Sequence, residues 1–341
     1  MPPIIDIHTH CSPPRPPGDR FGVQDALRGT PAGRNVITNY RGLPAVSYYE
    51  MGDFELQQAA CAKAGVTHRL ISTPFAAEVM AAISKSPSVD ICKAVNDGIA
   101  GIVAKAPTKS PNNWGLGTLN PLDAAHIAEG ERCLKELKFK GLLICSSWHG
   151  RFLDGEDSFA FWEWAQDRQV PVFLHPPRVP IGHAQQMDQF KLDELIGRPF
   201  DTAMTLARMI LSGLFDRYPR LKIVVAHMGG GLLPCMGRLD FGWRLGCEGM
   251  PEDSVIRCKK LPSEYLRLLH VDTMGFWAPH VREAVEVFGA DRVMFGTDYG
   301  PVPLDPREHV DIVNTLGIAP ADKEKILWRN AAAFFNLEVA G

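Results

Sequence analysis

The chain has 341 residues, of which 45% are hydrophobic and 22% are charged, and its formal net charge is −3 at pH 7. This composition is typical of a globular protein with a large core, and the slight negative charge argues against the basic surface that nucleic-acid binding requires. The sequence holds no apolar run of about 18 residues, the length that a membrane-spanning helix needs. We therefore expect neither nucleic acid nor a membrane among its partners.

The eight cysteines are scattered along the chain and form no Cys-x-x-Cys pair. In a chain of this length, such spacing is typical of reduced thiols rather than of a disulfide framework. The first residues also lack the basic and then apolar layout of a secretion signal. We expect a cytoplasmic protein.

Short apolar runs alternate with amphipathic segments along the chain. We expect strands at residues 4–8, 67–72, 114–119, 141–145, 171–175, 222–227, 269–272 and 293–298. The spacing of apolar residues between them predicts helices at 54–64, 76–105, 124–137, 159–168, 202–217, 281–288 and 306–316. A last helix is expected over about 321–335, where Ile326, Leu327, Ala331 and Phe334 keep helical spacing.

Eight unbroken apolar strands that alternate with helices predict an α/β fold, a distorted (β/α)₈ barrel whose parallel strands are buried on both faces. A single domain over residues 1–341 accounts for the whole chain, and the last helix should cap the barrel. An open doubly wound sheet is the alternative, but no Gly-x-Gly-x-x-Gly motif follows an early strand.

Residues 11–52 interrupt this alternation. The segment is rich in proline and glycine and carries five arginines, at positions 15, 20, 28, 34 and 41. It leaves the first predicted strand, so we expect a loop insertion that covers the active site. The alternative is a solvated loop or one that packs between subunits.

Polar residues that can bind metal end four of the predicted strands. His8 and His10 end the first strand, His175 the fifth, His227 the sixth and Asp298 the eighth. Residues two apart in a strand share a face, so His8 and His10 point the same way. The active sites of (β/α)₈ enzymes lie at the carboxyl ends of the strands, where these five side chains would converge. A single histidine at a strand end is more often structural, but the whole set predicts a metal site.

The order of these residues resembles the amidohydrolase superfamily. Residues 5–10 (IDIHTH), residues 214–231 (LFDRYPRLKIVVAHMGGG) and residues 289–299 (GADRVMFGTDY) are similar to the aminocarboxymuconate-semialdehyde decarboxylase family. The resemblance extends from residue 4 to about residue 337. It is weak over 11–52 and over 182–199, where substrate selectivity would reside.

The resemblance implies that His8, His10, His175 and Asp298 bind one divalent metal, most often Zn²⁺, with Mn²⁺ as the alternative. It also implies catalytic roles for His227 and Asp298, with His227 hydrogen-bonded to the metal-bound water. Zinc lowers the pKa of its water towards about 7, and a neighbouring imidazole titrates in the same range. Members with two metals carry a carboxylated lysine at the fourth strand, and residues 141–149 contain no lysine. We expect one metal.

Four residues are expected to bind substrate. Arg238, on the helix after the sixth strand, is similar to the family's carboxylate-binding arginine, although a surface salt bridge to Asp240 or a neighbouring carboxylate is an alternative role. Arg244 resembles an arginine that reaches the site of a partner subunit, so the resemblance implies a homodimer. Trp148 and Phe190 would contact a flat substrate, although a tryptophan is more often part of the core.

We expect a metal-dependent, non-oxidative decarboxylase of a carboxylated aromatic or unsaturated ring-cleavage-type acid. The metal and Arg238 would hold this small carboxylic acid, and His227 with the metal-bound water would handle the proton as CO₂ leaves. Hydrolysis of a lactone or amide, and hydration of an unsaturated carboxylic acid, would use the same centre and remain alternatives. A non-catalytic metal-binding protein is favoured only if a ligand or His227 were missing.

Overall fold

A computed structural model describes residues 2–11, 54–74, 76–83, 86–105, 111–182, 187, 189–246, 251, 255–302 and 304–339. The insertion expected at residues 11–52 lies outside the described residues except for Cys11, so that expectation stays a prediction.

Eight parallel strands occur in these described ranges, and they form two sheets. One sheet has the order β1-β2-β3 and the other has the order β10-β9-β8-β7-β4. The strands are β1 (Ile5–His10), β2 (His68–Ser72), β3 (Asn112–Gly115), β4 (Leu142–Cys145), β7 (Pro171–His175), β8 (Lys222–Val225), β9 (Leu269–Asp272) and β10 (Val293–Met294). Each overlaps one of the eight strands that the sequence predicts.

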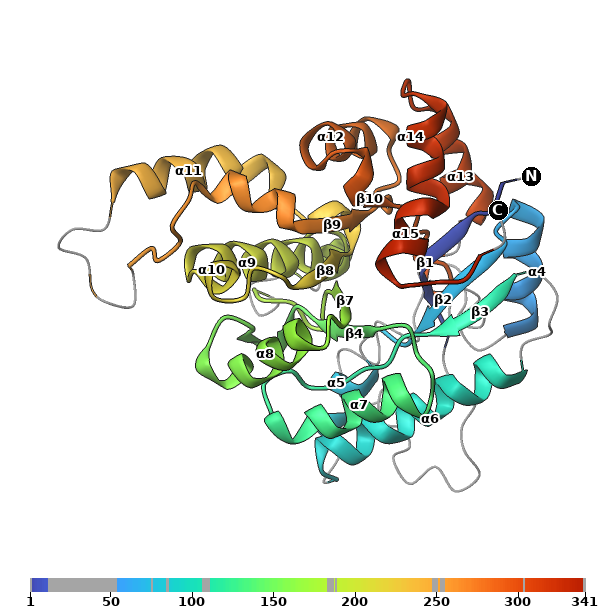
Figure 1. Cartoon of the computed structure of the whole chain (residues 1–341), viewed down its shortest axis with the longest axis horizontal. Helices are drawn as coiled ribbons and strands as arrows, with labels where there is room; N and C mark the ends of the chain where they lie inside the picture. Colours follow the sequence, from blue (N-terminus) through green and yellow to red (C-terminus); the bar gives the residue numbers. More distant parts are fainter. Residues whose placement is uncertain are drawn as a thin grey trace.

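Backbone hydrogen bonds join the two sheets at both edges. At one edge, the His10 N–H donates to the Tyr299 carbonyl at 2.9 Å, just beyond β10. At the other edge, the Leu143 N–H donates to the Gly117 carbonyl at 2.7 Å, just beyond β3. The strands therefore close into a ring, with helices lying around it (Figure 1). The predicted (β/α)₈ barrel is confirmed.

Apolar side chains from alternate strand positions fill the inside of the barrel. This interior cluster contains Ile5, Ile7, Leu70, Leu116, Leu143, Phe173, Val224, Ala226 and Met294. The C-terminal helical segment runs through α14 (Pro320–Glu324), the π-helical η11 (Lys325–Arg329) and α15 (Asn330–Phe334). It adds Ala331 and Phe334 to the interior cluster, so the predicted last helix does cap the barrel.

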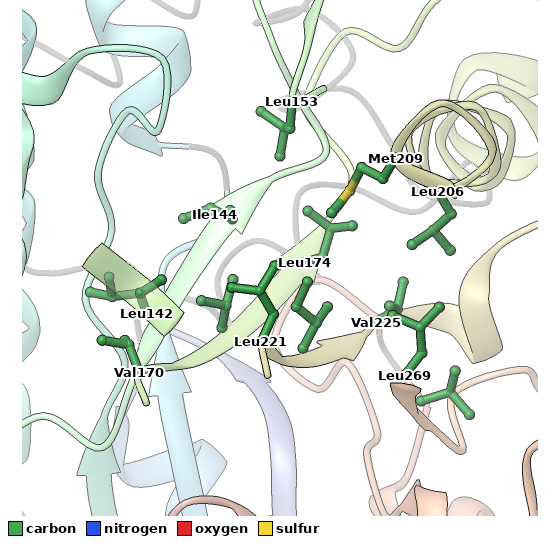
Figure 2. Close-up of a cluster of buried hydrophobic side chains, with 14 of the residues drawn as sticks. Leu142, Ile144, Leu153, Val170, Leu174, Leu206, Met209, Leu221, Val225 and Leu269 are labelled. Carbon is green, nitrogen blue, oxygen red and sulfur yellow. The ribbon is translucent and has the colours of Figure 1, made fainter. Parts of the chain in front are cut away.

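The outward-facing strand residues pack against the surrounding helices. Leu174 of β7 and Val225 of β8 face Leu206 and Met209 of α9 (Figure 2). All four side chains are fully buried, and burying each contributes about 1.5–3 kcal/mol to the stability of the fold.

The helices around the barrel are α4 (Phe54–Ala64), α5 (Ala76–Ile83), α6 (Ser88–Lys105), α7 (Ile127–Lys135), α8 (Phe159–Asp167), α9 (Arg198–Leu211), α10 (Leu214–Arg217), α11 (Met236–Leu245), α12 (Ala278–Phe288) and α13 (Pro306–Thr315). Within the described ranges, no helix has the length and apolar character to cross a bilayer.

Two predicted helices are wrong in their extent. The segment 76–105 forms α5 and α6, because Pro87 directly precedes α6 and cannot donate a helical hydrogen bond. The segment 202–217 is divided at Gly213, whose φ of +78° ends α9 without steric strain, and α9 itself begins earlier, at Arg198. The sequence also gave no sign of the short antiparallel pair β5 (Ser147–Trp148) and β6 (Arg151–Phe152) that follows β4.

Candidate metal centre

Three strand ends bring together four side chains that could bind a metal ion. His8 and His10 come from β1, His175 is the last residue of β7, and Asp298 follows β10. One ligand atom from each of these buried residues lies within 4.8 Å of all the others. The structure thus assembles the set for which the sequence predicts metal binding.

A register shift in β1 helps to aim the two histidines. Ile5 and Ile7 already face the barrel interior, so a regular strand would turn His8 and His10 outward. The pairing of β1 with β2 shifts between Asp6 and Thr9, and such a bulge re-aims the side chains beyond it. The His8 ring consequently lies 5.0 Å from the ring of Phe173, inside the barrel.

Each histidine of the set has a partner for its Nδ1 atom. The Nδ1 atom of His8 lies 2.6 Å from Asp272 Oδ2, and that of His10 lies 2.9 Å from Ser72 Oγ. The Nδ1 atom of His175 lies 2.9 Å from its neighbouring Pro176 carbonyl. These acceptors favour the proton on Nδ1, which leaves the lone pair of each Nε2 atom free to bind a metal.

The arrangement of these lone pairs fits a cation. The Nε2 atoms of His8 and His10 are 3.1 Å apart, and Asp298 Oδ1 lies 3.4 Å and 3.1 Å from them. His175 Nε2 is buried and has no hydrogen-bond partner within the described residues. Three imidazole nitrogens and one carboxylate oxygen make a donor set that suits a divalent transition metal.

The electrostatics of the set also favour metal binding. Burial lowers the pKa of His10 to about 4 and lowers the pKa of His175 well below its usual value, so both rings are neutral near pH 7. Burial also acts to lower the pKa of His8, but Asp298 and Asp272 outweigh it and raise this pKa. For Asp298, burial acts to raise the pKa, but His8 and His10 hold it well below its usual value. The aspartate is therefore an anion between imidazoles.

His227 lies at the edge of this set. It begins the 3₁₀ turn η6 (His227–Gly229) after β8, and its Nε2 atom lies 3.3 Å from Asp298 Oδ2. Its Nδ1 atom is buried without a hydrogen-bond partner in the described part of the chain. His227 and Asp298 both have a φ of +56°, which is unfavourable for residues other than glycine and is typical of functional sites.

The four predicted substrate-binding residues differ in their exposure. Arg238 and Arg244 are exposed on α11, which extends away from the barrel in Figure 1. Phe190 follows β7 and is 83% exposed, whereas Trp148 is only 5% exposed and belongs to the core between strands and helices. Their roles in binding substrate stay predictions. Asp240 accepts hydrogen bonds from Ser263, so the alternative bridge from Arg238 gains no support.

Two residues that contact the ligand histidines were not singled out from the sequence. Asp272 ends β9 and Ser72 ends β2, and each meets the Nδ1 atom of a ligand histidine. Both are polar residues at the ends of buried strands, the same signal that predicted the ligands. A search of all eight strand ends for polar side chains would have found them.

The fourth strand is not followed by a lysine within residues 141–149. β4 ends at Cys145 and is followed by Ser146, and both are buried. Among the described residues, the set of three histidines and Asp298 is the one group identified as able to hold a metal ion. The expectation of a single metal stays a prediction.

A closed (β/α)₈ barrel with these residues at its strand ends defines a class of metal-dependent enzymes. The chain matches the amidohydrolase family over residues 5–337, and it belongs to this family. The predicted family is thereby confirmed.

Two relatives that are similar in sequence are decarboxylases. The 2-amino-3-carboxymuconate-6-semialdehyde decarboxylase of Dictyostelium discoideum is 30% identical over 254 residues, which cover 74% of this chain and 68% of that protein. The gamma-resorcylate decarboxylase of Polaromonas sp. is 32% identical over 280 residues, which cover 76% of this chain and 80% of that protein. The predicted similarity to a decarboxylase branch is confirmed.

Solved structures agree with these sequence relatives. The 5-carboxyvanillate decarboxylase of Sphingomonas paucimobilis superposes with a TM-score of 0.81 at 28% identity, over 99% of this chain and 100% of that chain. A dihydroxybenzoic acid decarboxylase of Polaromonas sp., with bound manganese and 2-nitroresorcinol, has the same fold with a TM-score of 0.75 at 24% identity, over 100% of this chain and 98% of that chain.

Proposed function

We propose that this chain is a metal-dependent, non-oxidative decarboxylase of a carboxylated aromatic acid. The observation that carries the proposal is the position of His227, whose Nε2 atom lies 3.3 Å from Asp298 Oδ2 at the edge of the four-ligand set. A group that can carry a proton therefore lies directly beside a metal site. Among the relatives named above, the gamma-resorcylate and 5-carboxyvanillate decarboxylases are named for such acids, and they support the proposal.

We expect the ion to be Zn²⁺, held by His8, His10, His175 and Asp298, because three imidazole nitrogens favour zinc. Mn²⁺ is the competing ion, since a carboxylate also suits it and a relative of the same fold contains it. When bound, the ion supplies a positive charge that stabilises negative charge developing on the substrate. Elemental analysis of the purified protein would distinguish the two metals.

His227 is the group that moves the proton in this proposal. Asp298 remains a carboxylate at neutral pH, so its Oδ2 atom accepts a hydrogen bond from Nε2 and orients the ring. The protonated imidazole delivers its proton to the ring carbon that bears the carboxylate. The bond between this carbon and the carboxylate then breaks, its electron pair returns to the ring, and CO₂ leaves. A proton from solvent restores the imidazolium.

The decisive experiment measures products from a panel of acids. Protein loaded with zinc or manganese is incubated with gamma-resorcylate, 5-carboxyvanillate and 2-amino-3-carboxymuconate semialdehyde, the acids named for its relatives. We expect CO₂ and the decarboxylated product in equal amounts from at least one acid. Lactones, amides and unsaturated acids are tested in parallel. Turnover of these compounds without CO₂ from any acid would replace decarboxylation by hydrolysis or hydration.

We also propose the single domain, the homodimer and the cytoplasmic location that the sequence predicts. The family match over residues 5–337 supports a single domain. Sedimentation of the purified chain at several concentrations tests the dimer, and cell fractionation tests the location.

A further inference from the structure

The two carboxylate oxygens of Asp272 contact different groups: one contacts the ring of His8, and the other contacts two backbone amides. Its side chain is fully buried at the end of β9. The Oδ2 atom lies 2.6 Å from Nδ1 of His8. The Oδ1 atom accepts hydrogen bonds from the backbone N–H groups of Met228, at 3.1 Å, and Met274, at 3.2 Å. One side chain therefore contacts both a metal-binding histidine and the residue that follows His227.

We propose that Asp272 is a positioning residue that couples the metal site to the proton-transferring histidine. The inference rests on the proposed function, because it takes the roles of His8 and His227 from there. Asp272 itself is behind the ligand set, so it acts through its neighbours.

The contact with His8 controls which ring nitrogen carries the proton. A carboxylate can only accept a hydrogen bond, so the proton of a neutral His8 must lie on Nδ1 and the Nε2 lone pair faces the metal site. The opposite tautomer would place a hydrogen where the metal binds. The 2.6 Å separation between Nδ1 and Asp272 Oδ2 is typical of a strong, charge-assisted hydrogen bond.

The contact with the Met228 amide holds the turn that carries His227. His227 and Met228 both have a φ of +56°, and such backbone strain persists only where the surroundings enforce it. Asp272 Oδ1 holds the Met228 amide on one side. On the other side, the Met228 side chain packs over Gly275, where an added Cβ atom would lie 2.0 Å from the Met228 methyl carbon. The turn is therefore held by the carboxylate and by side-chain packing.

Two substitutions separate these two roles. Asp272→Asn keeps an oxygen that accepts from both amides, but it places an NH₂ group against Nδ1 of His8. This nitrogen must then accept a hydrogen bond, which moves the ring proton to Nε2. Asp272→Ala removes both contacts. The control is Ser72→Ala, which removes the uncharged partner of the other β1 histidine, His10, and leaves the turn at 227–229 untouched.

The first readout is metal retention. Zinc-loaded full-length protein is titrated with a chelator, and the apparent affinity is compared between variants. We expect Asp272→Asn and Asp272→Ala to lose affinity by about 10–100-fold, and Ser72→Ala to lose less, because its contact is neutral. Unchanged zinc affinity in both Asp272 variants overturns the role at His8.

The second readout is hydrogen–deuterium exchange of the peptide that contains residues 227–231, measured in the presence of excess zinc. Asp272→Asn should exchange like the parent protein, whereas Asp272→Ala should exchange faster there. At saturating zinc, kcat should accordingly fall further in Asp272→Ala than in Asp272→Asn, with little change in KM. Equal exchange in the two variants overturns the role at His227. Metal retention and exchange do not need turnover, so they remain decisive even if no acid releases CO₂ and the proposed function fails.

Discussion

Asp6 Oδ2 accepts a hydrogen bond of 2.6 Å from the Thr297 hydroxyl, 291 positions away in the chain. Asp6 Oδ1 also accepts hydrogen bonds from the backbone N–H groups of His8, at 3.0 Å, and Thr297, at 3.2 Å. Thr297 directly precedes Asp298, so this buried carboxyl group joins the two segments that provide three of the four predicted ligands. The metal centre thus depends on a residue that would not touch the metal.

Replacing this carboxyl group should destabilise the protein. In Asp6→Ala, two buried backbone N–H groups and one hydroxyl lose their acceptor. We expect the free energy of unfolding to decrease by about 2–5 kcal/mol. Asp6→Asn keeps one acceptor oxygen, so its free energy of unfolding should decrease by less than half of this amount. Urea denaturation of both variants measures the difference. Equal losses in the two variants would show that the backbone contacts of Asp6 contribute nothing.

His227→Asn should separate metal binding from turnover. His227 is outside the four-residue set, so the variant should retain about one metal per chain, while CO₂ release falls by roughly 10²–10⁴-fold with loss of the proton-carrying group. Elemental analysis and CO₂ measurement test the two halves. His280→Asn is the matched control, because it makes the same change on the surface of α12. Normal turnover in His227→Asn would refute its assigned role.

Gly296→Ala should disturb the metal centre by crowding. An added Cβ atom would lie 2.9 Å from Cβ of His8 and 3.1 Å from Cβ of Asp272. We expect a loss of stability of about 1–3 kcal/mol and weaker zinc binding, because both neighbours must move. Gly101→Ala is the control: it has no atom within 4 Å of an added Cβ and lies in a helix, so it should stabilise by about 0.5–1 kcal/mol. Chemical denaturation and chelator titration measure both effects, and wild-type behaviour of Gly296→Ala contradicts the prediction.

His270 should make stability depend on pH. Burial lowers the pKa of His270 to about 4, and the cationic Arg292, 3.4 Å from its Nε2 atom, acts in the same direction. An unfolded histidine titrates near pH 6.5, so between 6.5 and 4 the unfolded chain binds a proton that the folded chain does not. Stability therefore falls as the pH decreases through this window, by about 2 kcal/mol from this residue once solvent screening is included.

The variant His270→Leu removes this titration. Its free energy of unfolding should decrease less between pH 7 and pH 4.5 than that of the parent protein, when both are measured by urea denaturation in excess chelator. The chelator removes the metal contribution from the comparison. Parallel pH dependences would contradict the assignment.

The barrel and its ligand set could be predicted from sequence because both depend on local patterns. An unbroken apolar run predicts a buried strand, and the polar residue that ends it predicts a side chain at the mouth. His175 and His227 follow this rule without help from distant contacts. Closure of the barrel then brings them near His8 and His10, since the carboxyl ends of all eight parallel strands meet at one mouth.

The contacts behind the ligands could not be predicted in the same way. Asp272 and His8 are 264 positions apart, and no local pattern pairs their side chains. The bulge in β1 lies beside Asp6, whose contact with Thr297 is also long-range. The break before α6 could have been predicted from the sequence, because Pro87 has a local steric effect on the helix. The helical spacing of apolar residues on both sides of Pro87 nevertheless predicts one continuous helix.

The interior cluster has a consequence for the order in which this protein is made. Ile5 and Ile7 leave the ribosome long before Ala331 and Phe334, which complete the same cluster. At typical rates of about 5–20 residues per second, the interval between them is roughly 15–70 s. During that time the inner faces of the early strands have no permanent cover. The nascent chain therefore depends on chaperones or provisional packing until α15 is synthesised, and a chain that terminates before α15 leaves this end of the barrel interior uncovered.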